Sequence, residues 1–129
     1  MRTAVVSVLL SAAVLAPAAS AAEARVRGPA SVTPGRIVTF HATGFRPGNM
    51  VSVVLTPAGK PMCCAARIAA SFPVTPAGGA TLIFRMPRVY KNCADIWHCR
   101  KVRWRPNERV IVGVFGYLQE ASTITAIGG

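Results

Sequence analysis

The sequence predicts an all-β protein, an antiparallel sandwich of about seven strands that carries one long, disulfide-bonded basic loop. Short apolar stretches recur at intervals of about ten residues, which is the spacing of strands in sandwiches and barrels. Most of these stretches alternate apolar with polar residues, as a strand with one buried face does. No stretch keeps helical spacing long enough to predict a helix.

Residues 1–21 have the features of a secretory signal peptide. Ala4–Ala16 is an uncharged run of small and apolar residues, and Ala19–Ala21 supplies the small residues that a signal peptidase recognises. We therefore expect cleavage before Ala22, with Ala24 as a second option. The run is too short to span a bilayer, so we expect secretion to the cell envelope or exterior, with no membrane span in the mature chain.

The expected mature chain, residues 22–129, has the length of a single domain. The full sequence has 129 residues and a formal net charge of +11; residues 22–129 keep 14 basic and 4 acidic side chains, a net charge of +10. Hydrophobic residues make up 52% of the sequence, which excludes a disordered basic tail.

Alternation and turn residues predict the second, third and fourth strands. Residues 36–43 and 50–56 alternate apolar with more polar side chains. Each follows a Pro-Gly pair, Pro34-Gly35 or Pro47-Gly48, in which proline fixes φ and glycine allows the positive φ of a type II turn. Residues 66–72 lie between two prolines that leave too little room for a confident helix, so we expect a strand there.

The last three strands complete the sandwich. Residues 80–86 alternate again after a glycine-rich turn. Residues 109–117 are apolar on both faces, so we expect a central strand that is buried on both sides. The full set of expected strands is 25–32, 36–43, 50–56, 66–72, 80–86, 109–117 and 120–127.

Residues 38–53 (VTFHATGFRPGNMVSV) resemble a hallmark of secreted bacterial immunoglobulin-like domains. That hallmark is an alternating strand, Gly-Phe, Pro-Gly and a second alternating strand. Residues 80–84 (ATLIF) resemble a later strand of the same domains. The resemblance covers most of residues 30–86 and returns near 109–127. It implies an immunoglobulin-like β-sandwich, and as a pattern of strands and turns it implies no particular activity.

A second resemblance is to the neocarzinostatin-type apoproteins, secreted immunoglobulin-like domains with four cysteines that hold a small chromophore. The chain is similar to them in size, in cysteine count and over residues 38–53. It departs from them at the adjacent Cys63 and Cys64, which do not fit that family's two locally closed disulfide loops, and in its strong positive charge. The resemblance implies a small-molecule carrier as an alternative function, and it transfers no binding residue.

The four cysteines are Cys63, Cys64, Cys93 and Cys99, and secretion predicts two disulfides with three pairings open. A bond within Cys63–Cys64 closes an unusually small ring, so we favour two bonds that link residues 63–64 to residues 93–99. Each would close a loop of about 30 residues and stabilise the fold by about 3 kcal/mol. Zinc bound by Cys93, His98 and Cys99 with Cys63 or Cys64 is the alternative. Its ligand spacing is poor, so we expect no metal and no cofactor.

Basic residues are concentrated in an insertion at 87–108, between the fifth and sixth expected strands. From Arg85 to Arg109 there are eight basic and two acidic residues, with aromatic residues between them. This pattern is typical of surfaces that hold an anionic polymer by charge and stacking. The candidate contact residues are Arg88, Lys91, Trp97, Arg100, Lys101, Arg103, Trp104 and Arg105.

The insertion also has a purely structural interpretation. Trp97 and Trp104 would pin a disulfide-bonded loop over the end of the sandwich, while its charges keep it soluble. If residues 100–105 are extended, alternation places Val102 and Trp104 on one side, with Arg100, and the remaining basic residues on the other.

We expect a non-catalytic binding or structural module of the cell envelope or exterior, with the 87–108 insertion as its contact surface. Its partner would be an anionic envelope polymer or another envelope protein, and we do not expect nucleic acid. The alternative, a small-molecule carrier, requires a cavity of about 300 Å³ or more between the sheets or beside the insertion. A filled core in which Phe40, Phe84 and Phe115 touch would argue against it.

The sequence does not predict an enzyme. Only His41 and His98 could act as bases near neutral pH, and neither lies in a nucleophile motif. Glu108 and Glu120 lack the surroundings of a glycosidase pair, and the sequence has no phosphate-binding glycine loop.

Overall fold

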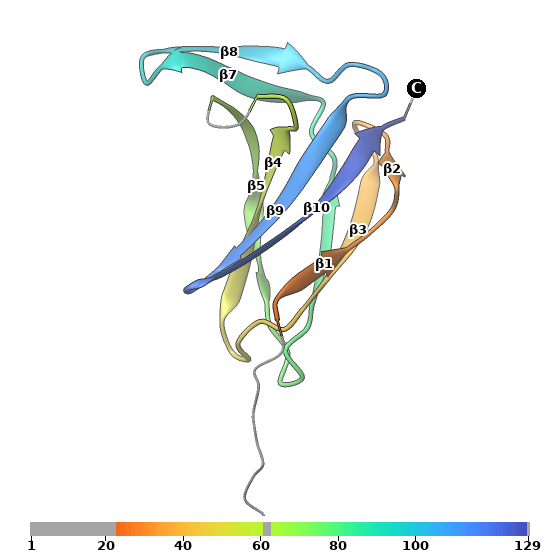
Figure 1. Ribbon diagram of the computed structural model, residues 1–129, viewed down its shortest axis with the longest axis vertical. Coiled ribbons are helices and arrows are strands. Elements are labelled where there is room, and N and C mark those ends of the chain that lie inside the picture. Colours follow the sequence, from red (N-terminus) through yellow and green to blue (C-terminus); the bar gives the residue numbers. More distant parts are fainter. Residues whose placement is uncertain (1–22, 61–62, 129) are drawn as a thin grey trace, which may run out of the picture.

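The computed structural model describes residues 23–60 and 63–128, which form ten β-strands in two sheets (Figure 1). The described residues include no helix, and thus none that is long and apolar enough to cross a membrane. The all-β sandwich predicted from the sequence is confirmed, whereas the expected signal peptide at 1–21 lies outside the described residues. The strands are β1 (Arg25–Arg27), β2 (Ser31–Val32), β3 (Ile37–Thr43), β4 (Met50–Pro57), β5 (Cys64–Pro73), β6 (Ala80–Arg85), β7 (Val89–Asp95), β8 (His98–Arg103), β9 (Arg109–Gly116) and β10 (Gln119–Ile127).

One sheet has the strand order β1-β3-β6 and the other the order β2-β10-β9-β4-β5-β7-β8. The first expected strand, 25–32, is divided between them: β1 pairs with β3, and β2 pairs in parallel with β10. The chain crosses over at Gly28 and Pro29. Any side chain at Gly28 would collide with the ring of Phe40, and Pro29 has no N–H for a sheet, so this break separates the two halves.

The core between the sheets follows the predicted alternation. The inward residues of β3, β4, β6 and β9 are buried, and Phe40 stacks on Phe84 with ring centroids 6.0 Å apart. Gly35 and Gly48 have φ values of 86° and 85°, which confirms the positive φ expected in both Pro-Gly turns. The interior is therefore filled by side chains from both sheets. The fully buried side chains include Leu82 of β6 and, on the central strands β4 and β9, Val53, Leu55, Val110, Val112 and Val114.

Strand β9 is central, as predicted, but it is not buried on both faces. Val110, Val112 and Val114 point into the core, whereas Phe115 is 41% exposed. The outer side chains of β9, with those of β4 and β10, line a groove that is open to solvent. Residues 109–117 are thus apolar on both faces because one face packs in the core and the other forms an accessible apolar surface.

The 87–108 insertion is not a loop. It forms an antiparallel hairpin of β7 and β8, and β7 extends the seven-stranded sheet by pairing with the start of β5 through Cys64–Asn92 and Ala65–Lys91. Because most hairpin positions are charged or polar, the sequence hid the alternation that marks a strand. In Figure 1 this hairpin lies across one end of the sandwich, and its turn projects beyond β4 and β5.

Candidate ligand-binding site

The register of the β7–β8 hairpin divides its side chains into two faces. Lys91 pairs with Lys101 and Tyr90 with Val102, and directly opposed residues in an antiparallel pair share a face. The face that holds Tyr90 is turned toward the core, since Tyr90 is buried. The other, outer face carries Val89, Lys91, Cys93, Cys99, Lys101 and Arg103.

Two aromatic residues anchor the hairpin to the sandwich. Trp104 is only 6% exposed and packs on Tyr90, with ring centroids 4.6 Å apart and a tilt of 45°. Its buried Nε1 finds no acceptor among the described residues. The anchoring role expected for Trp104 is thus confirmed, whereas the same expectation for Trp97 is wrong, because Trp97 is 81% exposed at the hairpin turn.

The disulfides are both local, and the expected bonds between residues 63–64 and 93–99 are wrong. Cys63 bonds to the adjacent Cys64, and Cys93 bonds to Cys99. The hairpin explains the second bond, because its register sets Cys93 directly opposite Cys99 with a Cα–Cα distance of 4.0 Å. All four sulfurs are therefore oxidised in this structure, which leaves the alternative zinc site without thiolates.

A pocket of about 470 Å³ lies at the fork where β7 separates from β5, and we call it the hairpin pocket. Residues of both strands line it, together with Lys101 of β8. Its lining is mainly apolar because alanine, valine and proline side chains make up much of the wall. The lining residues are Cys63, Ala65, Ala66, Arg67, Pro87, Val89, Tyr90, Lys91, Cys93 and Lys101.

Three cations and no anion are among the described residues that line the hairpin pocket: Arg67, Lys91 and Lys101. Lys91 and Lys101 oppose each other directly in the hairpin register, an arrangement that places two like charges on one face. Like charges at such a position repel and destabilise the pair unless a counterion lies between them. The pocket is therefore a region of positive potential with an apolar wall.

The remaining candidate contact residues do not join Lys91 and Lys101 at the pocket. Arg88 packs over Gly35 at the turn before β3, and Arg105 follows the end of β8. Arg103 shares the outer face but does not line the pocket, and Arg100 lies on the opposite face near the hairpin turn. The predicted basic surface is thus divided by the fold.

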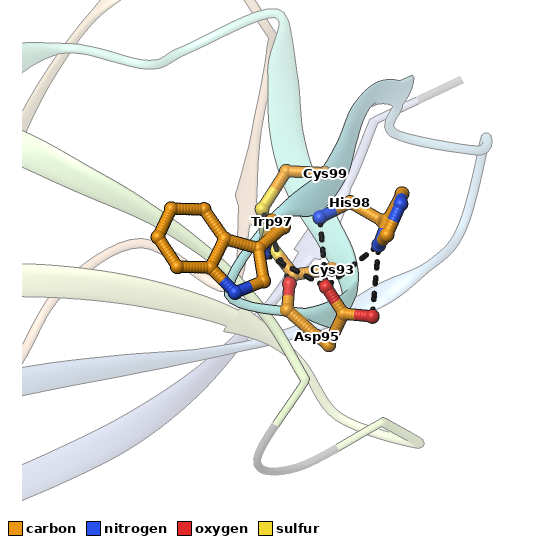
Figure 2. A network of polar contacts seen from close by, with 5 residues as sticks. All are labelled: Cys93, Asp95, Trp97, His98 and Cys99. Carbon is orange, nitrogen blue, oxygen red and sulfur yellow. Dashed lines mark hydrogen bonds and ion pairs between the residues drawn. A yellow bond between two sulfur atoms is a disulfide. The ribbon is translucent and has the colours of Figure 1, made fainter.

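The turn of the hairpin is ordered by Asp95 (Figure 2). Its Oδ1 accepts hydrogen bonds from the backbone N–H groups of Trp97, at 2.8 Å, and His98, at 3.0 Å. His98 Nδ1 lies 2.8 Å from both carboxylate oxygens. The backbone bond from Trp97 and then the His98 side chain lower the pKa of Asp95 below its ordinary value. Asp95 is therefore committed to holding the turn.

A second hollow, the sheet groove, lies on the outer face of β4, β9 and β10. It has a volume of about 430 Å³ and differs from the hairpin pocket because it contains Glu120 and no cation among its described lining residues. The apolar side chains Val54, Ile111 and Phe115 form its floor. The two hollows thus offer opposite charges beside apolar surface.

Sequence reasoning missed part of the hairpin pocket. Ala65 and Arg67 come from β5 and Cys63 directly precedes it, about 25 residues before Lys91 in the chain. Their odd-numbered positions place them on one face of a strand, which the sequence shows. Only the pairing of Ala65 with Lys91 brings that face beside the outer face of the hairpin, and no local signal encodes this pairing.

Comparison with known proteins reveals similarity in fold. No family model and no curated protein matches the sequence. Among solved structures, macromomycin is similar with a TM-score of 0.61 and 18% sequence identity over 81% of this chain and 99% of its own. The sulfur carrier protein SoxY from Chlorobium limicola f thiosulfatophilum has a TM-score of 0.38 and 15% identity over 82% of this chain and 74% of its own, which is too low to support an argument. The chain therefore shares an all-β fold with macromomycin, an apoprotein of the neocarzinostatin type.

Proposed function

We propose that the protein is a non-catalytic carrier that binds a small anion with an apolar body in the hairpin pocket. The observation that carries this proposal is the lining of that pocket, where apolar wall and three cations face one space of about 470 Å³. Small-molecule sites commonly have volumes of about 300–1,000 Å³ and combine an apolar lining with a few polar groups that fix the ligand.

A carrier function was expected to need a cavity between the sheets or beside the 87–108 insertion, and the hairpin pocket lies at the second of these places. Phe40 and Phe84 stack in the core, but Phe115 is on the outer face and does not complete the filled triad that would argue against a carrier. The fold of macromomycin supports the same function, because apoproteins of that type hold a small chromophore. The charge of this pocket favours a ligand that is anionic.

The two hollows predict different ligands. A carboxylate or sulfonate between Lys91 and Lys101 would relieve their repulsion and accept charge-assisted hydrogen bonds. In the sheet groove the same group would meet Glu120. Between these two hollows, an anionic ligand therefore prefers the hairpin pocket and a cationic ligand prefers the sheet groove, whereas charge gives a neutral ligand no preference.

A matched pair of fluorescent probes tests the proposal. 8-Anilinonaphthalene-1-sulfonate and N-phenyl-1-naphthylamine share an apolar body, and only the first carries a negative charge. We expect the protein to bind the sulfonate more tightly, and the double variant Lys91→Met/Lys101→Met to weaken that binding about tenfold or more while binding of the amine changes little.

The control variant Arg27→Met/Arg100→Met removes the same charge from outside the pocket. It should keep the sulfonate affinity at equal ionic strength. Equal weakening by both double variants would reduce the effect to net charge and contradict a specific anion site.

A pocket-filling pair tests the location separately from the charge. Ala65→Phe places a ring in the hairpin pocket, whereas Ala69→Phe adds the same ring to an exposed position on β5. We expect only the first to block both probes. Undiminished binding of both probes to Ala65→Phe would move the site elsewhere.

A second candidate function is contact with an anionic polymer in the extracellular space, and the row of Lys91, Lys101 and Arg103 on one face favours it. Retention on a heparin matrix should then fall steeply with salt. Changing Arg100, Lys101, Arg103 and Arg105 to Ser should cause earlier elution. Equal elution of variant and parent would remove the hairpin from consideration as a polyanion surface.

A further inference from the structure

Two large apolar side chains are exposed side by side at the turn between β7 and β8. Ile96 is 82% exposed and Trp97 is 81% exposed. The turn lies at the end of the hairpin that projects beyond the sandwich (Figure 1), so no neighbouring strand of the described chain covers it. Single exposed apolar residues are normal on a protein surface, whereas an adjacent pair at a projecting tip is a candidate contact site.

The exposure is imposed by the fold of the turn. The two hydrogen bonds to Asp95 Oδ1 fix the backbone at Trp97 and His98, and the Cys93–Cys99 bond closes the hairpin behind them. Figure 2 shows the indole of Trp97 and the imidazole of His98 on opposite sides of this turn. The side chains that would bury apolar surface on contact are therefore already held outward, so little backbone conformational freedom remains to be lost on binding.

Cations follow the apolar tip at a distance that suits a lipid interface. With a rise of about 3.3 Å per residue, Arg100 and Lys101 lie about 10–13 Å along the strand from Trp97. Lys91 is opposite Lys101, and Arg103 is further along the same face. The headgroup layer of a bilayer is about 5–7 Å thick, and long cationic side chains can extend back toward the tip. The apolar tip can therefore lie in the interface while the cations contact the headgroups. Asp95, the one acid of the hairpin, is occupied by its three donors.

We propose that this tip inserts Ile96 and Trp97 into the interface of a lipid bilayer with anionic headgroups, while the basic residues behind it contact those headgroups. Tryptophan prefers this depth because its ring is apolar and its N–H is polar. A soluble polyanion would use the charges but leave the apolar pair without a partner. A protein partner would need about 1,200 Å² of buried surface, far more than two side chains supply.

Vesicle binding by the full chain tests the proposal. Vesicles of phosphatidylcholine with phosphatidylglycerol should sediment the protein and shift its tryptophan emission to the blue, and brominated lipids should quench it. Trp104 is buried, so the change reports Trp97. Phosphatidylcholine alone should bind the protein more weakly, since it lacks the anionic headgroups.

The variants Ile96→Ser and Trp97→Ser should each weaken co-sedimentation with anionic vesicles about tenfold or more, because binding scales with buried apolar area. Ile83→Ser, at an exposed site on β6, is the matched control and should bind like the parent. Vesicle binding that survives both tip variants would show attraction by charge alone and overturn the proposal. Absence of vesicle binding by the parent, with heparin binding retained, would equally overturn it in favour of a polymer surface.

Discussion

The sandwich and the β7–β8 hairpin are stabilised in different ways. Strands β3, β4, β6 and β9 of the sandwich each bury one row of apolar side chains, and Phe40, Leu55 and Leu82 are at most 1% exposed. The hairpin buries Tyr90 and, just beyond β8, Trp104, while nearly all its other side chains are wholly or partly exposed. Burial therefore stabilises the sandwich, whereas the hairpin depends on an aromatic anchor, a disulfide and a hydrogen-bonded turn.

Because of this difference, stability and binding depend on different residues. Residues that contribute little to the core are free to carry charge and apolar surface for a partner. Both proposed contact sites, the hairpin pocket and the tip, lie at or on the hairpin. Substitutions of buried side chains in the sandwich should consequently change stability, and substitutions of side chains that line the hairpin pocket or form the tip should change binding.

The largest effect is expected in the core. Phe40→Ala should lower the free energy of unfolding by about 4 kcal/mol, because it removes a stacked, buried ring and leaves a cavity. Ile83→Ala, on the exposed face of the same sheet, should cost less than about 1 kcal/mol. Urea denaturation measures both, and similar costs for the two variants would contradict the assignment of the faces.

The anchor comes next. Trp104→Ala should lower the free energy of unfolding by about 3 kcal/mol, because it removes the ring that packs on Tyr90 and anchors the hairpin. Trp104→Phe should cost much less, because it keeps the ring contact and removes the buried N–H that has no acceptor among the described residues. A large loss for Trp104→Phe would mean that the N–H has a partner and that the anchor is polar.

Loss of the Cys93–Cys99 bond should lower the free energy needed to open the hairpin by about 2 kcal/mol in the chain-entropy model. In the variant Cys93→Ser/Cys99→Ser, amide exchange should accelerate by about thirtyfold in β7 and β8 and stay unchanged in β3 and β6. Uniform acceleration across both sheets would show that the hairpin and the sandwich unfold as one unit.

The smallest effect concerns pH and is confined to the turn. The pKa of Asp95 is lowered in the folded protein, first by the backbone bond from Trp97. The stabilisation of the turn is therefore present above the ordinary carboxyl pKa of 3.8 and is lost as pH falls through the lowered value. Amide signals of Trp97 and His98 should move in that acidic range and stay constant in Asp95→Asn, which does not titrate.

The sandwich was largely predictable from the sequence because its strands and turns depend on local sequence patterns. Alternation identified the buried faces of 36–43, 50–56 and 80–86, and the Pro-Gly turns placed the starts of the first two. The division of 25–32 was missed, since it depends on the close approach of Gly28 to the Phe40 ring on the neighbouring strand β3. The exposure of Phe115 was not predicted, because the sequence does not show whether another layer covers an apolar residue on the outer face of a strand.

The candidate site was predictable only in part. The concentration of charge located the hairpin, but pairing between distant strands decides which charges converge. Lys91 and Lys101 meet because they oppose each other in the hairpin, and Arg67 joins them because Ala65 pairs with Lys91. The disulfide pairing was wrong for the same reason, because an unrecognised hairpin conceals that Cys93 and Cys99 are neighbours.

Chemical-shift mapping with 8-anilinonaphthalene-1-sulfonate tests the central claim most directly, since it locates the ligand without any substitution. We predict that the largest amide shifts fall on residues 63–67, 87–93 and 101, which surround the hairpin pocket. Shifts concentrated instead on Val54, Ile111 and Glu120 would place the ligand in the sheet groove and contradict the assignment of function to the hairpin pocket.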